Sequence, residues 1–243
     1  MAMSKQGGSK TQDLLGLQPD PLTPTSESVE QYIAALQLAY QECDAEDNEQ
    51  RNWIKREVWN QIRLADAREA DRAPEVRDTL HRVYRLGTKP AIDGFNPGIP
   101  LGFVGFGPVN KLVRAFLRWW SPWYGKNWNA ETQTGVNYLT KSALRAFRPA
   151  IEADQVSINA DGSIAAIPFK LWFGPSVLDP EIEVLKIDYD IPQNKPALRG
   201  VLDEQVEIVP DVYLGKALLK IRGKHRLLLF FSNCSPEVGT SKS

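Results

Sequence analysis

Few side chains in this sequence are of the types that carry out acid–base or nucleophilic chemistry. Its 243 residues include two histidines, His81 and His225, and two cysteines, Cys43 and Cys234. Neither histidine lies at the spacing of a metal site or a catalytic triad, and a general base needs an orienting partner that the sequence does not reveal. The cysteines match no zinc or redox motif, which is typical of reduced thiols in the cytoplasm.

Two pairs of acidic residues lie close together in the sequence, but only one of them could act jointly on a metal ion or a sugar. Asp188 and Asp190 alternate with hydrophobic residues in the stretch IDYDI and so share one face of a predicted strand. A polar strand face usually points to water, and we favour that interpretation over a metal or glycosyl-transfer site. Asp203 and Glu204 are adjacent, so their side chains must face opposite sides of a strand.

No nucleophile, base and oxyanion donors occur together in the sequence, so we predict no catalytic residue. An enzyme that acts on small hydrophobic molecules is the weaker alternative. We predict no metal site, and no cofactor other than a bound lipid or pigment.

The most unusual segment, residues 93–128, combines glycines with aromatic and basic residues. Five glycines precede a predicted helix, and six aromatic residues then lie within thirteen positions. From residue 94 to residue 130 there are four Lys or Arg and no acid, and residues 212–226 contain five more and no acid. The basic residues predicted to contact an anionic surface are Lys111, Arg114, Arg118, Lys220, Arg222 and Lys224.

Three interpretations of this segment compete. In the first, the helix covers a barrel with its apolar face, and its basic face simply points to water. In the second, the helix lies on an anionic membrane surface or on a partner protein, with tryptophans at headgroup depth and Lys and Arg against phosphate. The third is nucleic-acid binding, which we rank lowest because the aromatic residues share the apolar stripe and no recognition motif is present.

The composition is that of a soluble globular protein with one or two domains. Hydrophobic residues make up 42% of the chain and charged residues 24%, and the net charge of -1 gives no general attraction to nucleic acid. No signal peptide is visible at the N-terminus, and no apolar stretch approaches the ~20 residues of a membrane-spanning helix. These features predict a cytoplasmic location, peripheral to a membrane in the second interpretation above.

Hydrophobic periodicity divides the chain into a helical and a strand-rich part. Residues 1–28 are polar and predict a flexible tail, and residues 29–87 predict a helical region with helices over 29–42, 53–65 and 74–87. After Gly87 the apolar period shifts towards two, and a slip at Val184 and Leu185 predicts a β-bulge. Strands are predicted over residues 123–128, 135–139, 155–158, 164–173, 182–191, 201–209, 212–221 and 226–232.

These elements predict an α+β fold. Strands at this spacing favour an antiparallel, lipocalin-like β-barrel over residues 88–234, preceded by the helical region and followed by a flexible tail at 235–243.

Two stretches resemble a known family. The string WYGKNW at 123–128, which follows Asp93, Gly94 and a predicted helix, is similar to the second half of uncharacterised bacterial GXWXG-type proteins. The stretch DEQVEIVPDVYLGKALLKI at 203–221 is similar to the closing hairpin of that family. The resemblance covers about residues 88–233, although phenylalanine (Phe95, Phe103) stands where the family's tryptophan is expected. It implies a lipocalin-like barrel whose apolar interior holds a small hydrophobic molecule.

The sequence therefore favours non-catalytic binding of a small hydrophobic or amphipathic ligand, such as a lipid, pigment or isoprenoid-like molecule, inside a barrel. Large rigid rings give a pocket its surface, and nearby glycines let the chain bend over its mouth. The residues predicted to line the pocket are Trp120, Trp123, Trp128, Phe169, Trp172 and Tyr189. The alternative is an interaction module that docks on an anionic membrane surface or a partner protein through its basic residues.

Overall fold

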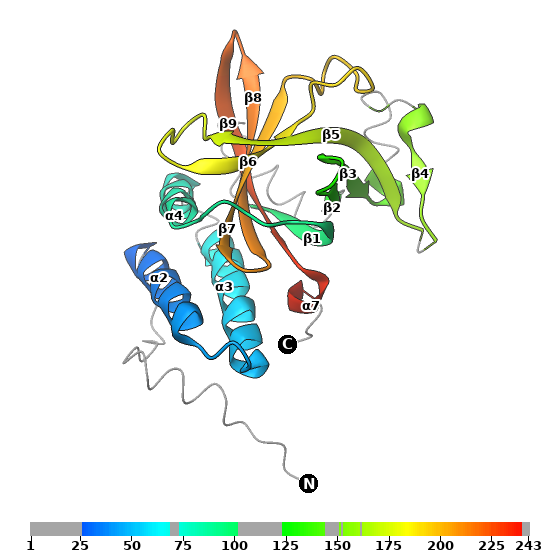
Figure 1. Cartoon of the computed structure of the whole chain (residues 1–243). Helices are drawn as coiled ribbons and strands as arrows, with labels where there is room; N and C mark the ends of the chain where they lie inside the picture. Colours follow the sequence, from blue (N-terminus) through cyan, green and yellow to red (C-terminus); the bar gives the residue numbers. More distant parts are fainter. Residues whose placement is uncertain are drawn as a thin grey trace.

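A barrel of antiparallel strands carries helices on one side of its outer surface (Figure 1). The computed structural model describes residues 26–68, 73–101, 123–143, 151, 153–160 and 162–239. The helices are α2 (Ser26–Glu42), α3 (Asn48–Arg68), α4 (Ala73–Arg85) and α7 (Pro236–Gly239), with a 3-10 turn η3 (Ala153–Gln155). The strands are β1 (Gly94–Leu101), β2 (Trp123–Asn129), β3 (Thr134–Leu139), β4 (Ser157–Ile158), β5 (Ile164–Pro175), β6 (Glu183–Asp188), β7 (Val201–Val209), β8 (Val212–Ile221) and β9 (Lys224–Cys234).

The strands form one sheet that closes on itself. Their order is β3-β2-β1-β9-β8-β7-β6-β5-β4, and a further pairing of β3 with β5 closes a ring that leaves only β4 outside. Closure removes exposed sheet edges, which would otherwise invite aggregation. Arg222 and Gly223 join β8 to β9, and both have the positive φ that a tight hairpin turn requires. The predicted antiparallel, lipocalin-like barrel with an N-terminal helical region is confirmed.

The helical region shares a hydrophobic core with the outer face of the barrel sheet. Helices α2, α3 and α4 bury their apolar faces against one another and against the outer face of β7 and β8. A single hydrophobic cluster contains Ile33, Ile54 and Leu80 from the helices and Val206 and Leu214 from the sheet. The Gln37 amide also donates hydrogen bonds to the carbonyls of Leu86 (3.0 Å) and Ile208 (2.6 Å), and so ties α2 to the sheet.

The predicted bulge at Val184 and Leu185 is wrong. β6 keeps a continuous register with β5 through both residues, and with β7 from Leu185 onwards. Both side chains are buried because Val184 packs beneath the helices while Leu185 faces the barrel interior. When both faces of a strand are covered, strict apolar–polar alternation is no longer expected, and the slip in the pattern does not indicate an extra residue.

β1 was not predicted, because its sequence GFNPGIPL contains two prolines and two glycines. The position of β1 in the barrel explains one of these glycines, Gly98. A side chain at Gly98 would lie about 2.4 Å from the Asn233 amide and 2.5 Å from the Trp123 ring, so only glycine fits.

The structure tests one of the two predicted flexible tails. The predicted flexible tail at 235–243 is wrong in part, since residues 236–239 form α7, whose Val238 is buried against the helical core. Most of the tail predicted at 1–28 lies outside the described residues. No described helix is long and apolar enough to span a membrane.

Candidate functional site

Four of the six predicted pocket residues come together inside the barrel. Trp128, Phe169 and Tyr189 are buried in one interior cluster, and Trp123 packs against it. Trp172 does not face the interior: it is 43% exposed and its indole lies against Lys186 on the outer face. Trp120 lies outside the described residues.

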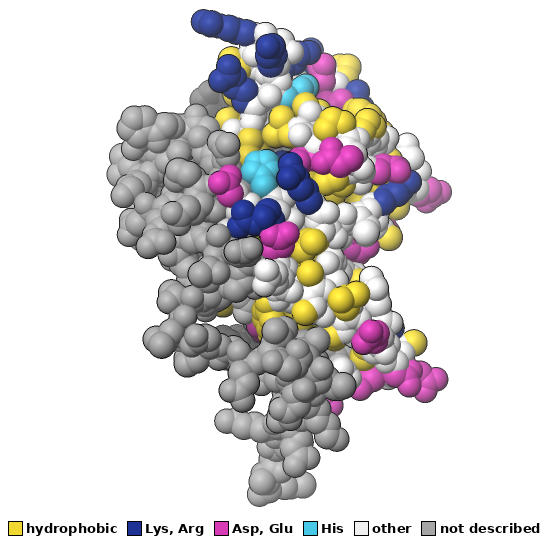
Figure 2. Space-filling model, turned by 90° about the vertical axis from the view of Figure 1, so that its left-hand side faces the viewer, with side chains coloured by type: hydrophobic (Ala, Val, Ile, Leu, Met, Phe, Trp, Pro, Cys, Tyr) yellow, Lys and Arg dark blue, Asp and Glu magenta, His cyan; other side chains and the backbone are white. Residues whose placement is uncertain are grey.

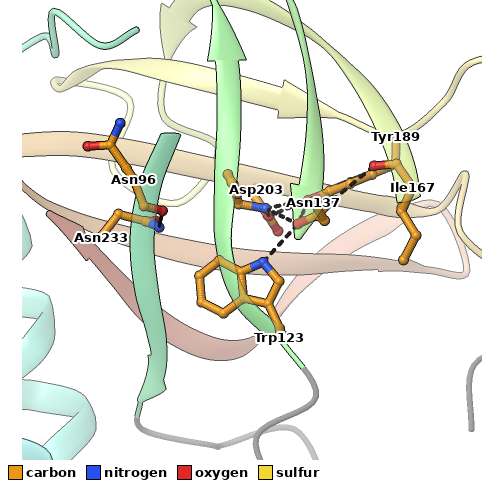
Figure 3. A network of polar contacts seen from close by, with 8 residues as sticks. Asn96, Trp123, Asn137, Ile167, Tyr189, Asp203 and Asn233 are labelled. Carbon is orange, nitrogen blue, oxygen red and sulfur yellow. Dashed lines mark hydrogen bonds and ion pairs between the residues drawn. The ribbon is translucent and has the colours of Figure 1, made fainter. Parts of the chain in front are cut away.

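The centre of the interior is a charged lysine enclosed by rings and polar groups. Lys126 Nζ lies 2.9 Å from Asp203 Oδ2, 2.9 Å from Asn137 Oδ1 and 2.5 Å from the Tyr189 hydroxyl. The Tyr189 hydroxyl also donates to Asp203 (2.9 Å), and the Trp123 indole donates to Asn137 (3.0 Å). Figure 3 shows Asn137 in the middle of this network, next to Asp203. Every ammonium proton therefore has an acceptor.

Aromatic rings surround the same ammonium group. Lys126 Nζ lies 5.3–5.4 Å from the ring centres of Trp123, Phe169, Tyr189 and Phe231, which is cation–π distance. Burial lowers the pKa of Lys126, although the Asp203 carboxylate opposes the shift. Burial likewise raises the pKa of Tyr189 well above its ordinary value. Lys126, Asn137, Tyr189 and Asp203 therefore form a polar plug across the barrel interior, in which each ammonium proton of Lys126 has a hydrogen-bond acceptor.

A bulge in β2 brings these residues to the same side. The register between β2 and β3 shifts between Trp123 and Gly125. Without that shift, residues three apart would point to opposite faces of the strand. With it, both Trp123 and Lys126 reach Asn137 inside the barrel.

The next layer towards the barrel mouth holds polar groups without partners. Gln205 is fully buried, and neither its amide oxygen nor its amide nitrogen finds a hydrogen-bond partner in the described part of the chain. The Trp128 indole nitrogen and the Asn233 amide oxygen are also buried without a hydrogen-bond partner among the described residues. Gln205 lies opposite Leu185 and Gly215 in the sheet register, which places its side chain inside the barrel. Buried polar groups are rarely left unpaired, so each requires a partner.

A pocket of about 440 Å³ lies at this mouth. Its lining comes from the segment before β1, the β2–β3 turn, β5 and β6, and includes Ile92, Leu171, Trp172, Phe173 and Leu185. Leu171 and Leu185 belong to the interior cluster, so the pocket opens directly onto the barrel core. A second hollow of about 450 Å³ runs over β2, β3 and β5, and polar residues such as Asn129, Thr134 and Gln193 contribute to it.

Two further carboxylates, Glu204 and Asp179, form ion pairs on the outer face of the sheet next to α4. Glu204 pairs with Lys186 and accepts hydrogen bonds from Ser176 and from the Val177 backbone (both 2.7 Å). A second carboxylate, that of Asp179, pairs with Lys216 of β8 and with Arg85 of α4. Arg85 Nη2 lies 2.7 Å from Asp179 Oδ1. Burial would raise the pKa of Asp179, but the hydrogen bonds from Lys216 and Arg85 outweigh it and lower that pKa. These pairs fix α4 and the β5–β6 loop on the barrel.

The structure confirms that Asp203 and Glu204 face opposite sides of their strand, since one binds Lys126 inside the barrel and the other Lys186 outside. Asp188 is paired with Lys170 on the outer surface (3.2 Å), and Asp190 is exposed. No group of three or more His, Cys, Asp or Glu among the described residues could hold a metal ion.

The predicted surface residues are only partly visible in the structure. Lys220, Arg222 and Lys224 are exposed at the tip of the β8–β9 hairpin. Figure 2 shows Lys and Arg side chains gathered at that end of the molecule, at the top of the view. Lys111, Arg114 and Arg118 lie outside the described residues.

Sequence reasoning missed Lys126, Asn137, Asp203 and Gln205. Lys126 was counted among the basic residues of segment 94–130 and assigned to no site, because an unbroken alternation gives no hint of the bulge beside it. Asp203 and Gln205 offered a weak signal, since they lie two residues apart in a predicted strand and therefore share the face opposite to Glu204.

No protein-family model matches the chain, and no curated protein matches it. Among solved structures, a crystal structure of a protein from Thermomonospora curvata is 17% identical. That match covers 74% of this chain and 97% of the other, with a TM-score of 0.41, a level that supports no argument about function. Of the resemblance noted in the sequence, the antiparallel barrel is present, and membership of the GXWXG-type family stays a prediction.

Proposed function

We propose that this protein binds a small hydrophobic or amphipathic molecule at the mouth of its barrel, without catalysis. The observation that carries the proposal is the pocket of about 440 Å³, which falls in the size range of small-molecule sites. Its walls are mainly apolar, and its floor is formed by Leu171 and Leu185 of the barrel core. The Lys126 network lies deeper and is saturated, so it supports a binding role better than a catalytic one.

Native mass spectrometry of the freshly purified protein, beside a denatured sample, tests this proposal. We expect an excess mass that disappears on denaturation and that identifies the carried molecule. Ala91 lines the pocket and is exposed, so Ala91→Trp should fill the mouth and abolish the excess mass. Ala197→Trp, on an exposed loop away from the pocket, is the matched control and should retain it. An apo mass for the wild type, together with indifference to a broad panel of lipids and pigments, would overturn the proposal.

The β8–β9 hairpin supports a second candidate, docking on an anionic membrane surface or partner protein. Its tip exposes Lys220, Arg222 and Lys224 around Ile221, which is itself 41% exposed. Basic residues near an anionic membrane contribute about 1 kcal/mol each, and an exposed apolar side chain can enter the interface.

Co-sedimentation with phosphatidylserine-containing vesicles tests this second candidate. Reversal of the three charges to Glu should abolish binding, and added salt should weaken it. Lys141→Glu, at an exposed position outside the hairpin, is the control. Binding that survives the triple reversal would rule out this surface.

A further inference from the structure

We propose that Gln205 and Trp128 recognise the head group of the bound molecule, and that this head group is neutral and both donates and accepts hydrogen bonds, as a primary amide or a hydroxyl does. This inference rests on the proposed function and narrows its ligand class. It starts from the contrast between two adjacent layers of the same barrel. The layer around Lys126 is fully hydrogen-bonded, whereas the layer above it is not.

The unpaired groups lie next to the pocket. Gln205 is directly opposite Leu185, a residue that lines the pocket. Side chains opposite each other in an antiparallel pair have Cβ atoms about 5 Å apart, so Gln205 lies directly behind the Leu185 wall of the pocket. Gln205 does not itself line the pocket, and a head group reaches it when the Leu185 side chain turns aside. Trp128 lies two residues beyond Lys126 on β2, on the same side of the polar plug, and it belongs to the same interior cluster as Leu185.

The identity of the unpaired atoms defines the chemistry of the head group. Gln205 offers one acceptor and one donor group, and Trp128 offers a donor. A ligand group that satisfies both residues must accept and donate. A buried polar atom without a partner costs about 1–3 kcal/mol, so occupancy by such a group is favoured.

Charge balance disfavours an ionised head group at the level of Gln205. The charged residues nearest to Gln205 along β7 are Asp203, which already neutralises Lys126 at 2.9 Å, and Glu207, whose carboxylate already accepts a hydrogen bond from the Asp211 backbone. A carboxylate or ammonium at the level of Gln205 would be buried without a counterion of its own, which is strongly unfavourable. The apolar tail of the molecule then extends towards the partly exposed rings of Phe173 and Trp172 at the rim.

The experiment compares probes that differ only in the head group. Isothermal titration of the ligand-stripped full chain would use decanamide, decanol, decanoate and decylamine, whose chains of about ten carbons suit a pocket of this size. We expect the amide and the alcohol to bind at least about tenfold more tightly than either ion, the equivalent of one hydrogen bond to a buried group.

Gln205→Leu is the decisive variant, because it keeps the volume and removes both polar atoms. It should weaken decanamide binding about tenfold while the protein remains at least as stable as the wild type, since an unpaired buried amide is lost. The exposed Gln193→Leu is the matched control and should bind as the wild type does. Trp128→Phe, which removes the indole donor and keeps an aromatic ring of smaller volume, should also lower the affinity for decanamide.

The outcomes separate the two proposals. Equal affinity for all four probes, or an amide preference that survives Gln205→Leu, overturns the head-group inference and leaves ligand binding standing. If no probe binds and no mass excess is found, the proposed function fails and the inference fails with it.

Discussion

Lys126 illustrates how a buried ammonium group is tolerated when each of its protons is donated to a hydrogen-bond acceptor. Three acceptors and four aromatic rings replace the water that the ammonium loses on burial. A buried ion pair rarely stabilises a fold more than apolar side chains of the same volume would. Removing one partner nevertheless lowers the stability strongly, because the other charge stays buried without a counterion. The network therefore holds β2, β3, β7 and the segment directly after β6 in one arrangement without adding much net stability.

This argument predicts a non-additive pair of substitutions. Lys126→Met leaves the Asp203 carboxylate buried and unpaired, and we expect it to lower the free energy of unfolding by about 3–5 kcal/mol in urea denaturation. The double variant Lys126→Met, Asp203→Leu removes both charges and should lose clearly less than the sum of the single losses. Strict additivity would show that the two residues do not act as a pair.

At the residue scale the sequence predicts the apolar part of the site and not its polar part. Trp123, Trp128, Phe169 and Tyr189 are large rings in strand-like segments, and such rings belong in a core. Lys126 follows a bulge whose position depends on contacts with β3 rather than on local sequence. Trp172 was misplaced because its ring was assigned to the core on size alone, whereas Phe169 and Leu171 take the interior positions of β5 and leave Trp172 on the outer face.

Among the elements, β8 shows how a small residue sets the packing of the strand beside it. Gly215 lies opposite Phe231 of β9, and a side chain at residue 215 would lie 2.2 Å from the Phe231 ring. The ring fills the space above the glycine and closes the interior at that level. The strand bounds of β7 and β8 were predicted from alternation, whereas β1 was missed because prolines and glycines obscure its pattern.

Gly215→Ala should therefore force the Phe231 ring out of place and lower the free energy of unfolding by about 1–3 kcal/mol. Gly200→Ala is the control, since its nearest neighbour would lie at an ordinary 3.6 Å and little change is expected. Chemical denaturation of both variants checks this, and equal stabilities would contradict the close packing.

The barrel mouth also carries a titratable group on β7. Burial raises the pKa of Glu207 to about 6 from an ordinary value near 4.5. Below pH 4.5 the residue is protonated in both states. As the pH rises towards 6 the unfolded chain ionises first, so the contribution of Glu207 to stability declines across this window and stays constant above it.

Glu207→Gln should remove this decline. We expect the stability of the variant, relative to the wild type, to increase between pH 4.5 and pH 7 and to be flat beyond that range. Thermal unfolding of both proteins across this range makes the comparison. A relative stability that does not change with pH would show that Glu207 titrates normally.

At the scale of the whole molecule, the helical region and the barrel form one folding unit. The sequence predicts both parts but not their joining, because the helices contact the outer face of strands more than 100 residues away. The contact is made by an apolar cluster buried beneath the helices and by the ion pair of the partly exposed Arg85 of α4 with the buried Asp179. His81 of α4 adds an edge-to-face contact with Phe230 of β9, at 5.1 Å between ring centres.

A truncation within α4 should consequently destabilise the barrel as well as the helix. Leu80 is fully buried in the shared cluster, and Leu80→Ala should cost about 2–5 kcal/mol of unfolding free energy. With Trp53 and Trp59 of α3 replaced by Phe, the described tryptophans that remain lie in the barrel, so fluorescence reports on the barrel and far-ultraviolet circular dichroism mainly on the helices. In urea we expect the two midpoints to fall together, with and without Leu80→Ala in this background. Leu38→Ala, at a 59% exposed position of α2, should leave the midpoint almost unchanged. If Leu80→Ala lowers only the dichroism midpoint, the helices unfold separately and the barrel stands on its own core.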